Sequence, residues 1–349
     1  MNYPVWDIPF LGGGMLIGLV AIIHTFVSQF AIGGGLYLVL TERKAYREKD
    51  PKIIDYVKLH SKFFILLTLV FGAISGVAIW FTIGLVSPMA TSSLIHIFVW
   101  GWAIEWVFFF IEIAAALIYY KTWDKIDRTT HLTIGWIYFI AAWMSLFVIN
   151  GILSFMLTPG AWLTTKSFWD AFFNPTMLPS MVMRSAVSLA LAGLYALLTA
   201  SNLNDQELRT KMVKYSSKWL IIPFFVLPIA GFWYTLTIPQ MALDIISGGA
   251  PAVTLFAAAG VGFSLLVFGF AYFLPYRHPD RFPTALGVMF LVLGLMVTGV
   301  SEWVREAIRK PYVIYNYLYS NNVFEYEKDN FRTNGILHNS KWVTVKSIE

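Results

Sequence analysis

The chain has 349 residues, of which 58% are hydrophobic and only 13% are charged. A water-soluble domain carries about 25% charged residues, so this composition indicates a polytopic membrane protein. The absence of cysteine excludes disulfides, iron–sulfur clusters and thiol-attached prosthetic groups. The net charge of +5 reflects basic residues in the connections expected on the cytoplasmic side of the membrane. We therefore expect no nucleic-acid partner.

Apolar segments long enough to cross a membrane recur along the chain. A helix of about 20 residues crosses the roughly 30 Å hydrocarbon core. Eight segments reach this length, which predicts an all-α, polytopic membrane helix bundle. They are 10–41, 62–87, 94–120, 132–157, 180–201, 218–238, 252–275 and 283–305. The N-terminal sequence MNYPVWDIPF lacks the basic residues of a signal peptide, so we expect the first span to be retained.

The charged residues between the spans predict the orientation. The connections after the first, third, fifth and seventh spans carry sixteen Lys and Arg residues, and the connections after the second, fourth and sixth carry only Lys166. Positive charge favours the cytoplasmic side. We therefore expect both termini on the extracytoplasmic side of the inner (cytoplasmic) membrane.

The chain divides into two parts by composition. We expect residues 1–311 to form the transmembrane helix bundle and residues 312–349 to form a polar extracytoplasmic tail, which is rich in aromatic residues. Two alternatives remain open for the tail: it packs on a partner protein, or it is partly disordered.

Three ionisable residues lie deep inside apolar spans, where such residues are costly and usually functional. Glu105 and Glu112 are seven residues apart, which places them on one helix face about 10.5 Å apart along the axis. This geometry suits a proton relay, although either residue could instead pair with a buried partner for structural reasons. His24 lies at a depth similar to that of Glu105. An imidazole and a carboxylate facing each other could hold a heme iron, but a lone histidine is often only a hydrogen-bonded core residue.

The last span ends in a cluster of charges on the side where few cations are expected. Arg305, Arg309 and Lys310 follow Glu302 in the sequence Glu-Trp-Val-Arg-Glu-Ala-Ile-Arg-Lys-Pro. Guanidinium groups bind carboxylates in a bidentate manner, so these cations could hold heme propionates. A simple ion-pair network with Glu302 and Glu306 is the alternative.

Several stretches, taken together and in order, resemble subunit I of cytochrome bd-type terminal oxidases. They are His24-Thr-Phe with Glu42, Gly72-Ala-Ile-Ser-Gly76, Ala103-Ile-Glu105 with Glu112, Trp123-Asp124, Asn150-Gly151 and Glu306-Ala-Ile-Arg309-Lys310-Pro311. The resemblance implies two hemes, of b- and/or d-type. It implies that His24 is the axial ligand of the oxygen-reactive heme, that Glu105 lies on the other face of that heme, and that Glu112 is the next relay carboxylate. Glu306 would ligate the iron of the second high-spin heme.

The sequence also departs from that family. The position of a histidine that ligates the family's low-spin heme corresponds here to Arg184, in Ser180-Met-Val-Met-Arg184. Met183 is a candidate sulfur ligand nearby, although methionine in a membrane helix usually serves packing. The long quinol-binding loop of the family is replaced by the short connection 237–251. We therefore expect a divergent, shortened relative that has lost the quinol-oxidising half.

Three interpretations follow for function. The first is a heme-bearing oxidoreductase subunit of a respiratory complex, which reduces oxygen or another small acceptor with electrons from an extracytoplasmic donor such as a c-type cytochrome. The second is a non-catalytic membrane anchor or electron conduit of a larger complex. The third is a proton-coupled transporter, against which the sequence shows no inverted repeat. Other membrane subunits and lipid are the expected neighbours in the membrane.

Overall fold

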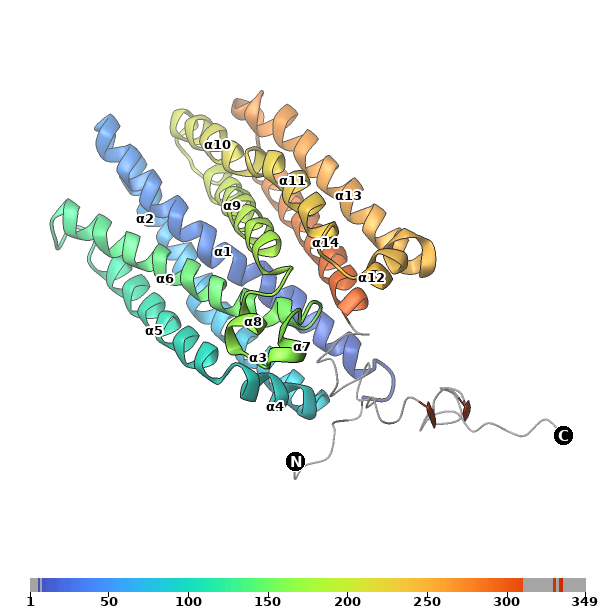
Figure 1. Cartoon of the computed structure of the whole chain (residues 1–349). Helices are drawn as coiled ribbons and strands as arrows, with labels where there is room; N and C mark the ends of the chain where they lie inside the picture. The colour runs from blue at the N-terminus through green and yellow to red at the C-terminus, as the bar shows by residue number, and fades with distance from the viewer. Residues whose placement is uncertain (1–5, 7, 310–328, 331–332, 335–349) are drawn as a thin grey trace.

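The structure is a computed structural model, and it describes residues 6, 8–309, 329–330 and 333–334. Most of the expected tail 312–349 lies outside the described residues, as does Lys310. The described chain is a bundle of long helices that run side by side (Figure 1).

Eight helical spans are long and apolar enough to cross a membrane, which confirms the predicted fold class. They are α1 (Gly13–Glu48); α2 (Pro51–Ile65) continued by the π-helical turn η1 (Leu66–Gly72) and α3 (Ala73–Val86); α5 (Val99–Lys121); α6 (Arg128–Phe155); α9 (Met177–Ser201); α10 (Gln206–Ile221) continued by α11 (Pro223–Thr235); α13 (Pro251–Ala271) continued by η3 (Tyr272–Tyr276); and α14 (Thr284–Arg309). Shorter helices connect them: α4 (Pro88–Ile97), α7 (Trp162–Thr165), α8 (Phe168–Phe172), α12 (Gln240–Asp244), η2 (Ile245–Gly249) and η4 (Pro279–Arg281).

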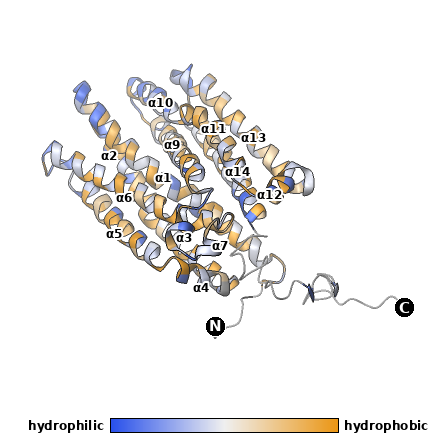
Figure 2. Cartoon of the chain, viewed as in Figure 1, coloured by the Kyte–Doolittle hydropathy of each residue, from blue (hydrophilic) through white to orange (hydrophobic). Residues whose placement is uncertain are grey.

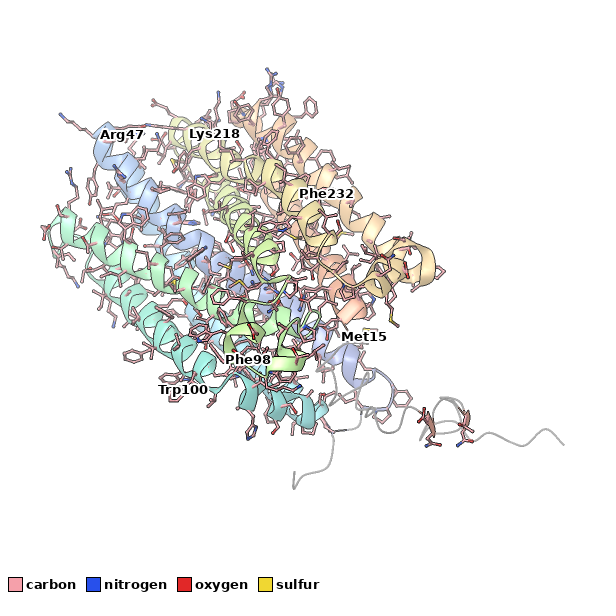
Figure 3. The ribbon with its side chains drawn as sticks, in the orientation of Figure 1. Met15, Arg47, Phe98, Trp100, Lys218 and Phe232 are labelled. Atoms are coloured by element: carbon pink, nitrogen blue, oxygen red, sulfur yellow. The ribbon has the colours of Figure 1, made fainter. Side chains whose placement is uncertain are left out.

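Aspartates cap three helices at the end of the bundle where the basic residues gather. Asp127 accepts hydrogen bonds from the backbone N–H groups of Thr129 and Thr130 at the start of α6. Asp50 and Asp205 cap α2 and α10 in the same way. A side-chain acceptor satisfies backbone donors that a helix start leaves unpaired. This is the end marked by Arg47 in Figure 3, and its hydrophilic residues are visible in Figure 2.

The third span begins later than the sequence indicates. The expected span 94–120 includes a break at Phe98, whose φ of −116° and ψ of 30° end α4 and start α5. Phe98 is fully buried and packs against Phe155 at a ring-centroid distance of 5.1 Å. Burial of this side chain turns the backbone, a tertiary effect that apolar composition does not reveal.

Helix α1 lies at the centre and packs against α2, α6, α9 and α14. Small residues allow these helices to approach closely, as is common in membranes. A Cβ added at Gly33 would lie 1.9 Å from the carbonyl oxygen of Ser188 on α9. The outward faces of α5 and α13 expose large apolar side chains, including Trp100, Trp106 and Leu255. Such faces suit contact with lipid or with helices of partner subunits.

Candidate functional site

A cavity of about 920 Å³ lies among the helices at the end of the bundle away from the basic residues. Its lining brings together His24 of α1, Glu105 and Glu112 of α5, Arg184 of α9, and Arg305, Glu306 and Arg309 of α14. Pockets for cofactors and other small molecules have volumes of roughly 300–1,000 Å³. The cavity is therefore large enough for a bulky prosthetic group, and it collects nearly all of the ionisable residues that the sequence singles out.

The hydrogen bonds at Ser75 favour one tautomer of His24. The Oγ of Ser75 donates to the carbonyl oxygen of Gly72 over 3.0 Å. Because the serine has only this one proton, it accepts a hydrogen bond from Nδ1 of His24, 3.2 Å away. Nε2 is then unprotonated and available as a ligand. A partner that orients the imidazole through its second nitrogen is typical of metal-ligating histidines.

The backbone around His24 leaves room for the imidazole. A Cβ added at Gly76 would lie 3.3 Å from Cε1 of His24. The turn η1 ends at Gly72, whose carbonyl oxygen holds Ser75. A π-helical turn shifts the register of a helix and often occurs at functional sites. The local distortion of this span thus positions the serine that orients His24.

Helix α6 supplies a hydroxyl to each of the two carboxylates on α5. The Oγ of Ser145 donates to Glu105 over 2.9 Å, and the Oη of Tyr138 lies 3.2 Å from Glu112. Tyr138 also donates to the carbonyl oxygen of Ala31 on α1, over 2.8 Å. The tyrosine has one proton, so its hydroxyl donates to only one of these two acceptors at a time.

The charges at the end of α14 form a partly buried network at the edge of the cavity. Arg305 donates to Glu302 over 2.8 Å through Nε, and Arg309 donates to Glu306. The Nε and Nη1 of Arg309 are buried without a hydrogen-bond partner among the described residues. The cluster is therefore an ion-pair network, and Arg309, which lines the cavity, keeps guanidinium donors without partners among the described residues.

These features fit a heme. Within the described residues, no group of three His, Asp or Glu side chains could hold a bare metal ion. A porphyrin supplies four ligands of its own, so its iron needs only one or two from the protein. His24, Glu105 and Glu306 offer candidate axial ligands. The unpartnered donors of Arg309 suit a propionate, because guanidinium groups bind carboxylates.

The other predicted site residues take different positions. Met183 is half-buried on α9 and is not among the described residues that line the cavity. Lys310 falls outside the described residues. The sequence motif at residues 72–76 contains Ser75 but did not predict its role, and Tyr138 and Ser145 were not predicted as site residues. The heptad spacing of Tyr138 and Ser145 on α6 matches that of the two glutamates on α5, and this signal could have found them.

Fold and cavity together define a multi-pass membrane protein with a cavity of cofactor size, whose mostly apolar lining carries several ionisable side chains. The sequence profile of the cytochrome bd terminal oxidase subunit I family matches residues 15–241. The structure of bd oxidase from Geobacillus thermodenitrificans superimposes with a TM-score of 0.77, at 16% sequence identity, over 94% of each chain. Comparison with curated proteins found no match.

The chain belongs to the cytochrome bd terminal oxidase subunit I family. It is therefore a membrane subunit of a respiratory oxidase. Membership of this family implies heme and a role in electron transport. The resemblance noted from the ordered motifs is confirmed. Members of this family normally bind hemes and work with other membrane subunits, which agrees with the apolar outer faces of α5 and α13.

Proposed function

We propose that the chain is a heme-bearing catalytic subunit that reduces oxygen or a similarly small acceptor. The observation that carries this proposal is the convergence of four helices on one cavity, which places His24, Glu105, Arg184 and Glu306 on its lining. Heme iron, when bound there, supplies electron storage and an open coordination position for a small acceptor.

In this proposal His24 would bind the iron through Nε2, while Ser75 holds Nδ1. Glu306 would be the ligand of a second heme, and Arg305, Arg309 and Lys310 would hold propionates. The hemes would be of b- and/or d-type. Met183 and Arg184 remain candidates for cofactor contact, and Arg184 is favoured because it lines the cavity.

Glu112 and Glu105 deliver protons toward the cavity. When Glu112 is protonated, Tyr138 donates to Ala31; when Glu112 is ionised, the hydroxyl turns to donate to the carboxylate. Tyr138 therefore stabilises both protonation states of Glu112 without moving its backbone. Glu105, bonded to Ser145, is the last carboxylate of this route on α5.

The electron donor is proposed to be a c-type cytochrome at the extracytoplasmic face. The connection between α11 and α13 contains only α12 and η2, which leaves little chain for a quinol-binding loop. The segment with α7 and α8 exposes Trp169 and Phe173 to 64% and 54%. It lies at the same end of the bundle as Phe98 (Figure 3), so it offers a docking surface near the cavity.

Absorption spectra of the purified protein test the proposal directly. Oxidised and dithionite-reduced spectra would be recorded with and without carbon monoxide. High-spin heme bands that shift with carbon monoxide are the expected result, because the acceptor position must be open. Heme bands indifferent to carbon monoxide would instead support the electron conduit. A well-folded protein without heme would overturn the proposal and favour the anchor or the transporter.

A further inference from the structure

The pairing of α5 with α6 continues past the cavity. Tyr119 follows Glu112 by seven residues, and His131 precedes Tyr138 by seven. Nε2 of His131 lies 2.9 Å from the backbone carbonyl oxygen of Tyr119. Three pairs thus repeat along the two antiparallel helices at the same interval: Glu105 with Ser145, Glu112 with Tyr138, and Tyr119 with His131.

The third pair holds a buried carboxylate from α1. Glu42 is fully buried; its Oε1 lies 2.9 Å from Nδ1 of His131, and its Oε2 accepts a hydrogen bond from the hydroxyl of Tyr119 over 2.7 Å. The carbonyl of Tyr119 only accepts, so Nε2 of His131 is protonated. The contact between Nδ1 and Glu42 then shares one further proton, carried by either partner.

Aromatic and charged side chains surround this pair. The ring of His131 packs against the rings of Tyr119 and Trp123, with centroid distances of 4.2 Å and 4.1 Å. The charges nearby are Arg128, 5.0 Å from the ring of Tyr46, and Lys58, which pairs with Asp124 at 2.5 Å and lies 5.8 Å from the ring of Trp123.

One residue lies between the pair and solvent. Tyr46 lies one helical turn beyond Glu42 on α1 and is partly exposed. Its phenol is therefore the candidate group through which a proton from solvent reaches the Glu42 carboxylate, which is itself fully buried.

A small cavity of about 10 Å³ separates the third pair from the second. Its lining includes Ser61, Tyr119 and Tyr138, together with Gly35 and Gly135. This volume is close to the minimum of roughly 10–15 Å³ that holds one water molecule. The remaining lining is apolar.

We propose that Glu42 and His131 form a proton-loading site that feeds Glu112 and the large cavity through Tyr138. A proton from the Tyr46 side binds the Glu42 carboxylate. It then passes through the small cavity to the Oη of Tyr138, which gives up its own proton to an ionised Glu112. No charge other than the proton moves. The inference rests on the proposed function, since it supplies the protons that the acceptor consumes.

Hydrogen–deuterium exchange at Glu112 tests this route without requiring heme or turnover. The stretching band of its protonated carboxyl would be assigned in infrared spectra by its loss in Glu112→Gln. Exchange would then be followed after transfer to deuterated buffer in the full-length protein. Glu42→Gln, which keeps the side-chain shape but removes the titrating group, is expected to slow exchange about a hundredfold.

Tyr119→Phe and Tyr56→Phe form a matched pair of further variants. Both remove a buried phenol hydroxyl, but Tyr56 bonds to Tyr37 and Thr199, away from α5 and α6. Tyr119→Phe is expected to slow exchange at Glu112, and Tyr56→Phe is expected to leave it at the wild-type rate.

If Glu112 exchanged at the wild-type rate in Glu42→Gln, the contact between Glu42 and His131 would be only structural and the proposal would be overturned. This holds even if the variant has a lowered melting temperature. Equal slowing in both tyrosine variants would overturn it as well. Absence of heme would contradict the proposed function only.

Discussion

Ser75 orients His24: its Oγ donates to the carbonyl oxygen of Gly72 and accepts from Nδ1 of the histidine, 3.2 Å away. The turn η1 brings this serine into place, and Gly76 leaves space beside the imidazole. The candidate ligand is therefore held by a span other than its own, so its geometry depends on how α1 packs against α3.

Removal of the Ser75 hydroxyl is the first test of this relationship. Ser75→Ala is expected to weaken heme binding about ten- to a hundredfold, as loss of an orienting partner does at other metal sites. His24→Ala is expected to abolish the bands of that heme. The heme-to-protein ratio and the reduced spectrum measure both effects.

Thr82→Ala provides the control, because the Thr82 hydroxyl bonds only to the carbonyl oxygen of Ala78 within α3 and the residue does not line the cavity in the described structure. An unchanged heme content in both Ser75→Ala and His24→Ala would contradict ligation by His24.

Arg309→Gln should release the cofactor more readily. Its buried guanidinium keeps two nitrogens without partners among the described residues, and a hydrogen bond to a charged group contributes about 1.5–3 kcal/mol. Heme loss to an acceptor protein, followed by absorption, would therefore be faster by about ten- to a hundredfold. Arg281→Gln is the control, because Arg281 is exposed and lies far along the chain from α14's charged end. Equal rates of heme loss in the two variants would contradict a role for Arg309 in binding a propionate.

Glu105→Gln distinguishes an oxidase from an electron conduit. The variant keeps a hydrogen-bonding partner for Ser145 but cannot transfer a proton, which is expected to lower oxygen consumption about a hundredfold. An oxygen electrode with an artificial electron donor gives the rate. Glu207→Gln, a surface change on α10, should consume oxygen like the unaltered protein. Undiminished consumption in Glu105→Gln would show that this carboxylate is not on the proton route.

The stability of the bundle should fall in acid. Lys52 and the N–H groups at the start of α10 hold the pKa of Asp205 below its ordinary value, and Lys211 does the same for Asp50. A carboxyl with a lowered folded-state pKa stabilises the fold above its unfolded pKa of about 3.9, and this contribution is lost as pH falls through the folded pKa. The melting temperature in detergent should therefore drop below about pH 4.

Asp205→Asn tests the assignment, since asparagine still caps a helix but carries no charge. Its melting temperature should be less sensitive to pH in the acid range than that of the unaltered protein. An identical pH profile in the variant would mean that other carboxyls cause the acid loss.

Gly33→Ala should destabilise the contact between α1 and α9. The added Cβ would collide with the Ser188 carbonyl oxygen at 1.9 Å, and such overpacking costs about 1–3 kcal/mol. Gly262→Ala on α13 is the matched control, because nothing lies within 4 Å of its added Cβ. Thermal unfolding measures the difference. A melting temperature for Gly33→Ala that equals that of the control would mean that the helices separate freely there.

The sequence by itself determined the class of protein, the eight spans and the family. Apolar runs of this length have one stable form in a membrane, because only a helix satisfies its backbone hydrogen bonds within the segment. The ionisable residues His24, Glu105 and Glu112 stood out for the same reason, since a charge in an apolar span is costly. These are local properties, and each can be read from a short stretch of chain.

The tertiary structure alone decided what surrounds those residues. The partnership of Ser75 with His24 joins residues 51 positions apart, and that of Glu42 with His131 joins residues 89 apart. The break at Phe98 also depends on burial against a distant helix. Serine, tyrosine and threonine are common in membrane helices, so their identity carries little information. Only the packing of α1 against α3, α5 and α6 shows which hydroxyls face a carboxylate or an imidazole.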